Sequence, residues 1–197
     1  GEGATAKAAK KMGTMFGIST MATTSIEEIG KLTNGPKLFQ LYIHKDKGLT
    51  NNLIERSRKA GFNSMCLTVD AAVAGNRERD RRTGFTTPPK LTLSSLLSFA
   101  LHPGWTLNNL LHEKFQLANL IHMTKKGSSI DKSVIDYINE QFDPSMNWKD
   151  AEYCVKKWGG PFALKGVMSV EDAKKAIDIG CTAIMISNHG GRQLDGS

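Results

Sequence analysis

Short apolar runs alternate along the chain with stretches whose apolar residues recur at helical spacing. The runs are rich in β-forming residues and bounded by turn signals, so they predict five β-strands, at residues 14–19, 38–43, 64–69, 162–167 and 182–187. The stretches between them predict helices at residues 4–12, 26–32, 49–60, 148–158 and 169–180. Because strands and helices alternate and the strands are almost continuously apolar, the sequence predicts an α/β fold with a parallel sheet covered by helices.

Polar residues at the strand ends help to choose between the two architectures that fit this alternation, a TIM (β/α)8 barrel and a doubly wound sheet. Each predicted strand has a hydrogen-bonding side chain at or near its carboxyl end, and these residues are Ser19, Gln40, Tyr42, Thr68, Lys165 and Ser187. In a barrel, this edge carries the active site. A doubly wound sheet would concentrate its signal in one glycine-rich first turn, and the chain has no GxGxxG motif. The pattern therefore favours the barrel.

A long segment between the third and fourth predicted strands interrupts the alternation. We interpret residues 1–197 as one partial barrel domain and residues 71–146 as a long inserted loop of irregular structure. The insert is apolar for a loop, with Leu96, Leu97 and Phe99 among its side chains. Two interpretations stay open: contact with an anionic membrane face, or a cover that packs over the barrel mouth or between subunits.

Composition narrows the class of protein. Of the 197 residues, 40% are hydrophobic, which is typical of a globular domain and excludes a disordered tail or a disulfide-rich miniprotein. The length falls short of the roughly 250 residues of a complete barrel. No stretch approaches the ~20 apolar residues of a membrane-spanning helix, and the start has no signal-peptide pattern. The three widely spaced cysteines predict reduced thiols and a cytoplasmic protein.

The charge balance is basic, with 26 Lys and Arg against 19 Asp and Glu, a formal net charge of +7. This excess suits anionic partners of several kinds. A nucleic-acid or membrane-surface binding module without catalysis is thus the alternative from another class. No interleaving of aromatic and basic residues supports nucleic-acid binding, so we expect none. The histidines show no paired spacing, so we expect no metal site.

The C-terminal segment Ser187-Asn188-His189-Gly190-Gly191-Arg192-Gln193-Leu194-Asp195 carries the strongest chemical signal. It is a strand end that opens into a glycine-rich loop, where the backbone can approach a ligand closely. His189 can exchange a proton near neutral pH. Arg192 offers a planar fork for a carboxylate or phosphate. A base and an anion anchor on one loop suit proton abstraction from a small anionic acid.

This segment resembles the active-site signature of the FMN-dependent α-hydroxy acid dehydrogenase and oxidase family, whose fold is the TIM barrel. Other segments match that family in the same order: residues 19–23, 39–42, 67–70, 75–77, 148–150 and 164–167. The resemblance covers essentially the whole chain. His102-Pro103-Gly104-Trp105 in the insert and Phe142-Asp143-Pro144-Ser145 before the next helix are more similar to the bacterial respiratory L-lactate dehydrogenase branch. In that branch, the insert is associated with membrane contact.

The resemblance implies a role for each site residue. His189 would take a proton from a 2-hydroxy acid, Arg192 would bind its carboxylate and Tyr42 would hydrogen-bond to it. Arg77 would lie near the mouth of the site. Lys165 would stabilise the anion of reduced FMN, as electrons arriving on the flavin require. The FMN ring would contact Ser19, Gln40, Thr68, Lys165 and Ser187.

The resemblance also implies a reaction and its setting. The product would be a 2-oxo acid, with L-lactate as the preferred substrate and a quinone or cytochrome as electron acceptor. The alternative within the family is an oxidase that passes electrons to oxygen, and a catalytically silent barrel is disfavoured by the intact His189 and Arg192. We expect a homo-oligomer when full length, in the cytoplasm or peripheral on the inner face of the plasma membrane.

The same comparison predicts that the chain is an internal fragment covering about strands 2 to 6 of the barrel, with the long loop after strand 4. The aspartate that orients the catalytic histidine, a second substrate arginine and the loops that hold the FMN phosphate are expected outside it. Such a piece would leave two sheet edges unpaired. We therefore expect the isolated chain to be weakly stable and to bind FMN poorly.

Overall fold

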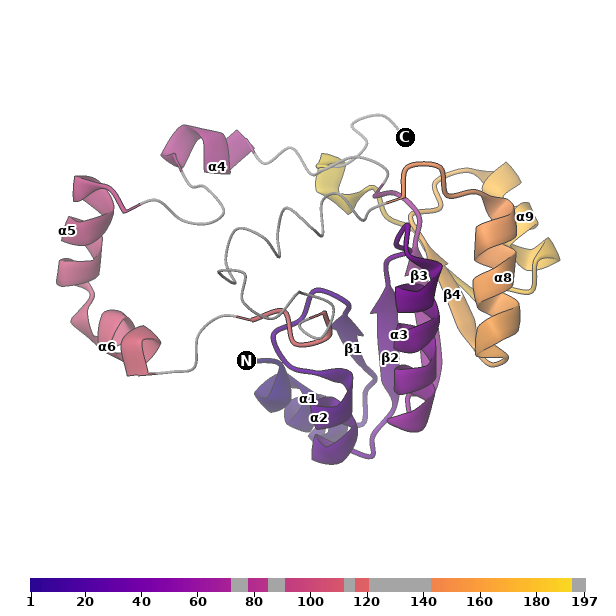
Figure 1. Ribbon diagram of the computed structural model, residues 1–197, viewed down its shortest axis with the longest axis horizontal. Helices are drawn as coiled ribbons and strands as arrows, with labels where there is room; N and C mark the ends of the chain where they lie inside the picture. Colours follow the sequence, from indigo (N-terminus) through magenta and orange to yellow (C-terminus); the bar gives the residue numbers. More distant parts are fainter. Residues whose placement is uncertain (72–77, 85–90, 112–115, 121–142, 193–197) are drawn as a thin grey trace.

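The five strands form one parallel sheet in the order β1-β2-β3-β4-β5 (Figure 1). They are β1 (Phe16–Ser19), β2 (Lys37–Leu41), β3 (Ser64–Thr68), β4 (Phe162–Lys165) and β5 (Ala183–Met185). The computed structural model describes residues 1–71, 78–84, 91–111, 116–120 and 143–192. Each strand pairs with the next one along the chain, whereas a doubly wound sheet reverses its order at a switch point. The order is that of a TIM-barrel segment, as predicted.

The helix α1 (Glu2–Lys11) precedes the first strand and begins after Gly1 without a capping side chain. The other helices that pack with the sheet begin where the sequence supplies capping side chains, and they are α2 (Ile26–Leu32), α3 (Lys47–Lys59), α8 (Trp148–Trp158) and α9 (Val170–Asp178). Ser25 and Glu28 form the predicted capping box of α2, and Asn147 caps α8. The helix α3 begins at Lys47, two residues before the predicted start, because the Asp46 carboxylate caps it by accepting hydrogen bonds from the Gly48 and Leu49 N–H groups.

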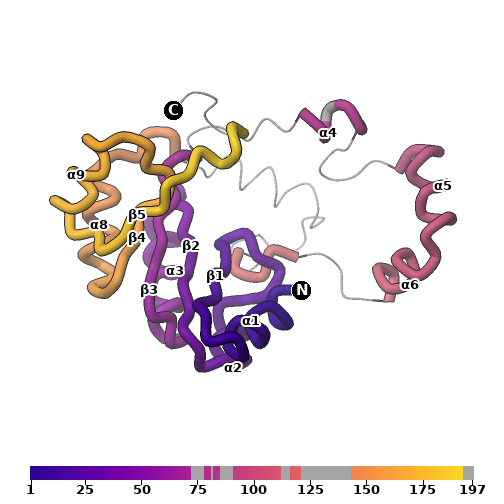
Figure 2. The backbone as a smooth tube through the Cα atoms, turned by 180° about the vertical axis from the view of Figure 1, so that it is seen from behind, coloured from indigo at the N-terminus to yellow at the C-terminus, as the bar shows by residue number. Residues whose placement is uncertain are grey.

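The hydrophobic core lies between the sheet and its helices. All five residues of β3 are buried, because this central strand has neighbours on both sides. Phe39 and Leu41 of β2 and Leu53 of α3 are fully buried. β5 is an edge strand with partly exposed residues. Contacts of α3 with β2, and of α8 with β3, place these helices side by side on one layer (Figures 1 and 2).

The segment predicted as one irregular loop contains three described helices, so that part of the prediction is wrong. They are α4 (Glu78–Thr83), α5 (Leu93–Leu101) and α6 (Pro103–Leu111). Thr92 and Ser95 form a capping box at the start of α5, and proline at the first position suits the start of α6. Figures 1 and 2 both show α5 and α6 set apart from the sheet.

A short piece of the insert, residues 116–120, returns to the body of the protein. Leu117 and Leu120 are buried there, and the Ala118 N–H donates to the Ala22 carbonyl at 3.2 Å. This piece therefore packs beside the loop that follows β1. None of the described helices has both the length and the apolar character needed to cross a bilayer.

Candidate active site at the carboxyl edge of the sheet

The parallel register brings the predicted polar residues to one edge of the sheet. Ser19 ends β1 and is paired in register with Gln40 of β2, while Thr68 ends β3 and is paired with Lys165 of β4. The Gln40 amide donates a hydrogen bond to the Thr68 hydroxyl, which links the second and third strands. The sheet edge thus presents a row of side-chain donors and acceptors from neighbouring strands.

At the β4–β5 side of this edge, Lys165 is the centre of a polar cluster. Its Nζ donates to the Ser187 Oγ at 3.1 Å and lies 3.3 Å from Nε2 of His189. It also lies 3.8 Å from the Asp70 carboxylate. The Lys165 and His189 side chains are 22% and 21% exposed, so both remain accessible to a ligand from the open side.

Asp70 completes the cluster. Its Oδ2 lies 2.6 Å from Nδ1 of His189, and its side chain is only 2% exposed. Within the described chain, neither carboxylate oxygen has an aligned hydrogen-bond donor. A buried carboxylate in this position needs positive charge beside it, and the ammonium of Lys165, 3.8 Å away, provides that charge. The expectation that the aspartate orienting His189 lies outside the chain is therefore wrong.

The sequence did contain a signal for Asp70. It follows Thr68 by two residues, and side chains two apart along an extended strand share a face. A carboxylate on the same face as a strand-end site residue was therefore a candidate for the site.

Close backbone packing holds Asp70 in place. Gly166 has φ +104°, and a Cβ at this position would lie 2.7 Å from both Cβ and Cγ of Asp70. Glycine is thus the residue that lets the turn after β4 pass directly beside the carboxylate. Any larger side chain would have to displace either the turn or Asp70.

The loop that carries His189 has an unusual backbone. His189 has φ 55°, and Gly190 and Gly191 follow with φ 65° and 70° in the short 3-10 turn η2 (His189–Gly191). A non-glycine residue in this region costs roughly 1–2 kcal/mol, and such residues cluster at functional sites. The Ser187 Oγ accepts the His189 N–H at 3.1 Å and so helps to hold the strained residue.

The remaining predicted site residues are less closely joined. Arg192 directly follows η2, so it lies on the same loop as His189. Its side chain is exposed. Tyr42 is half-buried just after β2, and its N–H donates to the Thr20 Oγ1 at 3.3 Å. Arg77 lies outside the described residues.

Cys66 lies in β3 below the cluster, and burial raises the pKa of its thiol to about 11. Its Sγ contacts the Met185 Sδ at 3.5 Å. A thiol of this kind stays protonated at neutral pH, so it packs as an apolar group and is no nucleophile. All three cysteines are free, in agreement with the predicted reduced thiols.

Within the described part of the chain, no cluster of potential ligands could hold a metal ion.

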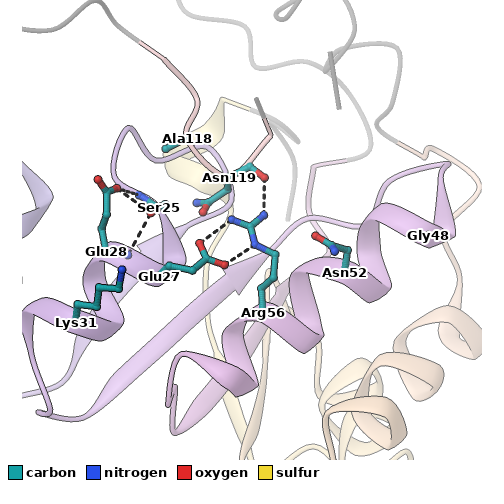
Figure 3. A pocket seen from close by; sticks show the side chains of 9 residues that line it. All are labelled: Ser25, Glu27, Glu28, Lys31, Gly48, Asn52, Arg56, Ala118 and Asn119. Carbon is teal, nitrogen blue, oxygen red and sulfur yellow. Dashed lines mark hydrogen bonds and ion pairs between the residues drawn. The ribbon is translucent and has the colours of Figure 1, made fainter. Parts of the chain in front are cut away.

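A hollow in the surface lies elsewhere, against α2 and α3 (Figure 3). Glu27, Arg56 and Asn119 are among the residues that line it, and none of the predicted site residues does so. The chemistry of the carboxyl edge is therefore separate from this hollow.

Comparison with known proteins shows the family of the chain. The sequence profile of the FMN-dependent dehydrogenase family matches residues 1–197. An L-lactate dehydrogenase of Vibrio parahaemolyticus serotype O3:K6 is 39% identical over 197 residues, which make up 100% of this chain and 52% of that protein. One from Acinetobacter baumannii is 38% identical, covering 100% and 51%. The chain spans about half the length of the curated relatives it matches.

Solved structures give the same picture. The monotopic membrane protein (S)-mandelate dehydrogenase is 34% identical, with a TM-score of 0.92 over 100% of this chain and 52% of that one. A chain described as a lactate oxidase of Pediococcus acidilactici is 30% identical, with a TM-score of 0.74 over 100% and 45%. The chain belongs to the FMN-dependent dehydrogenase family, and its sheet is part of a TIM barrel.

The residues at the carboxyl edge fit the cofactor of this family. An isoalloxazine ring presents carbonyl oxygens and ring nitrogens along its edge, and it requires donors spread over several strands. Gln40, Thr68 and Lys165 supply such donors from three adjacent strands. The partly buried side chain of Lys165 would also supply positive charge where a reduced ring gains electrons.

Proposed function

We propose that the complete protein containing this chain oxidises a small L-2-hydroxy acid, with L-lactate preferred, to the 2-oxo acid with the help of FMN. The contact between Asp70 and His189 beside Lys165 carries this proposal. It joins a base, a carboxylate that favours positive charge on that base, and a cation at the edge where the family holds its cofactor. The 38–39% identity to proteins named L-lactate dehydrogenase supports the choice of substrate.

His189 is the base in this proposal. It accepts the proton of the substrate hydroxyl, and the ring then carries a positive charge. The buried Asp70 carboxylate, 2.6 Å from Nδ1, stabilises that charge and fixes the ring so that Nε2 faces the substrate. Bound FMN would accept the two electrons and the hydrogen that leave the substrate carbon.

Other residues bind and orient. Arg192 binds the substrate carboxylate through its planar fork, and Tyr42 donates a hydrogen bond to the substrate. Arg77 is proposed near the mouth of the site. Lys165 places its charge beside the ring edge that becomes anionic on reduction. The ring itself is held by Ser19, Gln40, Thr68, Lys165 and Ser187.

We propose a quinone or a cytochrome as the electron acceptor of a homo-oligomeric enzyme. Oxygen is the second candidate, because one structural neighbour is described as a lactate oxidase. Whether the protein uses a quinone or cytochrome, or oxygen, depends on which of these acceptors can reach the reduced FMN ring.

The test uses the complete protein, purified without added flavin, and its visible spectrum recorded anaerobically before and after L-lactate. We expect a flavin spectrum that bleaches with L-lactate and not with D-lactate. Slow recolouring in air then indicates a dehydrogenase, and fast recolouring indicates an oxidase. A folded protein without flavin contradicts the proposal, and a spectrum unchanged by lactate, glycolate and mandelate contradicts the reaction.

We also propose that α5 and α6 contact a membrane peripherally at the cytoplasmic face. Large apolar side chains are exposed on both helices, and Phe99 and Trp105 stack across them at 5.5 Å. Each helix has nine residues, enough to lie in the interface and too few to span it. A structural neighbour with a TM-score of 0.92 is described as a monotopic membrane protein.

A further inference from the structure

Asn119, in the part of the insert that returns to the sheet, is a buried side chain with two well-defined partners. It is 1% exposed. Its Oδ1 accepts the Ile26 N–H at the start of α2, at 2.9 Å. Its Nδ2 donates to the Ser19 carbonyl at 3.3 Å. One side chain thus bridges the last residue of β1 and the first residue of the following helix, across 100 positions of the sequence.

The Ser19 carbonyl belongs to a peptide unit that is fixed on both sides. The N–H of the same unit, from Thr20, donates to the Gln40 carbonyl at 2.9 Å, and the Thr20 hydroxyl donates to it at 2.8 Å. The orientation of this peptide therefore sets the relative position of Ser19 and Gln40. Both are residues that the proposed function assigns to the FMN ring.

Arg56 of α3 hydrogen-bonds to the backbone of Asn119 (Figure 3). Its Nη1 donates to the Asn119 carbonyl at 2.9 Å. Its Nε and Nη2 donate to the two carboxylate oxygens of Glu27 in α2 at 2.7 and 2.8 Å. A two-bond pair between a guanidinium and a carboxylate is rigid as well as strong. The backbone of the insert is thereby fixed against both helices that flank β2.

We propose that Asn119 is a positioning residue for the cofactor site: it holds the Ser19–Thr20 peptide so that Ser19 and Gln40 face the FMN ring together. This inference rests on the proposed function and adds a residue outside the family motifs of the sequence. The inserted segment then contributes to the cofactor site, because residues 116–120 of the insert pack beside β1 and include Asn119. The Ser19 carbonyl also accepts the Ala22 N–H at 3.1 Å, so removal of the Asn119 donor leaves this carbonyl paired within its own loop but no longer tied to the insert and α2.

Asn119→Asp separates the positioning role from a structural one. The new carboxylate keeps an acceptor for the Ile26 N–H, and negative charge suits the start of a helix. It replaces the donor to the Ser19 carbonyl with a second acceptor, so only that contact turns repulsive. Gln116→Ala is the matched control, since Gln116 lies in the same segment and is exposed. Each variant is made in the complete protein, the FMN is removed and the apoprotein is titrated with FMN.

We expect Asn119→Asp to weaken FMN binding about tenfold and to shift the visible flavin spectrum. Because the new carboxylate is buried, we also expect a lower apoprotein unfolding temperature, so the spectrum is the measurement that a merely structural role would leave unchanged. Gln116→Ala should match wild type in all three measurements. Unchanged FMN affinity and spectrum, with or without a lower unfolding temperature, would overturn the proposal. If Asn119→Asp does not fold, Arg56→Lys decides: it keeps the charge facing Glu27 but weakens the hold on Asn119, so an unchanged affinity there overturns the proposal too.

The two proposals fail in different ways. If wild-type protein binds no FMN, or bound FMN is not reduced by any L-2-hydroxy acid, the proposed function fails. If wild type binds and is reduced while Asn119→Asp behaves like Gln116→Ala, only the positioning role fails.

Discussion

Two residues with left-handed backbone meet around the Asp70 carboxylate. Gly166 passes beside it with φ +104°, and His189 contacts it from a backbone with φ 55°. Both φ values are energetically unfavourable for residues other than glycine, so the surrounding structure must impose these backbone conformations. The geometry of the base therefore depends on a glycine that takes no part in the chemistry.

Gly166→Ala tests this dependence. The new Cβ would lie within 2.7 Å of Asp70, which must move away from His189. A misplacement of about 1 Å can cost ~10²-fold, so we expect turnover of L-lactate to fall about 100-fold with smaller changes in FMN affinity. Gly180→Ala is the control, because its φ of +95° is similarly strained but its nearest neighbour is Val155. Equal turnover in the two variants would contradict the role of Gly166.

Among the elements, α5 and α6 show how a local signal can be present without a tertiary partner. The Thr92–Ser95 capping box marks the start of α5, yet none of the residues of that helix is buried. Helices of nine residues are marginal in water unless an apolar face is covered. Exposure of this surface is the reason for assigning it to a membrane.

The membrane assignment predicts the behaviour of a triple variant. Changing Leu96, Leu97 and Phe99 to Ser removes three large apolar side chains, each worth about 1.5–3 kcal/mol when buried. We expect sedimentation of the complete protein with anionic phospholipid vesicles to fall at least about tenfold, with lactate oxidation in solution retained. Changing Ser94 and Ser98 to Ala in the same helix should leave sedimentation intact. Equal sedimentation of the triple variant and wild type would exclude α5 as the contact.

On the scale of the whole molecule, the packed sheet buries a titratable group away from the site. His44 follows β2 and is fully buried, and desolvation lowers the pKa of its imidazole to about 4, although Asp46 and the Tyr42 backbone act in the opposite direction. The unfolded chain has the ordinary value of 6.5. Between these values the unfolded state binds more protons, so stability falls as the pH falls through this range.

This difference predicts an acid-sensitive fold. The free energy of unfolding should decrease by about 2 kcal/mol between pH 7 and pH 5 because of His44 alone. In His44→Gln this part of the decrease should vanish, even if the variant is less stable at pH 7. Urea unfolding of the complete protein at several pH values measures both slopes. Parallel slopes in wild type and variant would show that His44 is protonated equally in both states.

The sequence by itself determined the alternation of strands and helices, the carboxyl-edge residues and the His189 loop. These features depend on residues close together in the chain, where periodicity, caps and glycines act directly. The tertiary structure alone decided that Asp70 contacts His189 and that Asn119 reaches Ser19. Such pairs form because parallel strands and a returning insert bring distant residues to one edge, and no local pattern encodes which of them will meet.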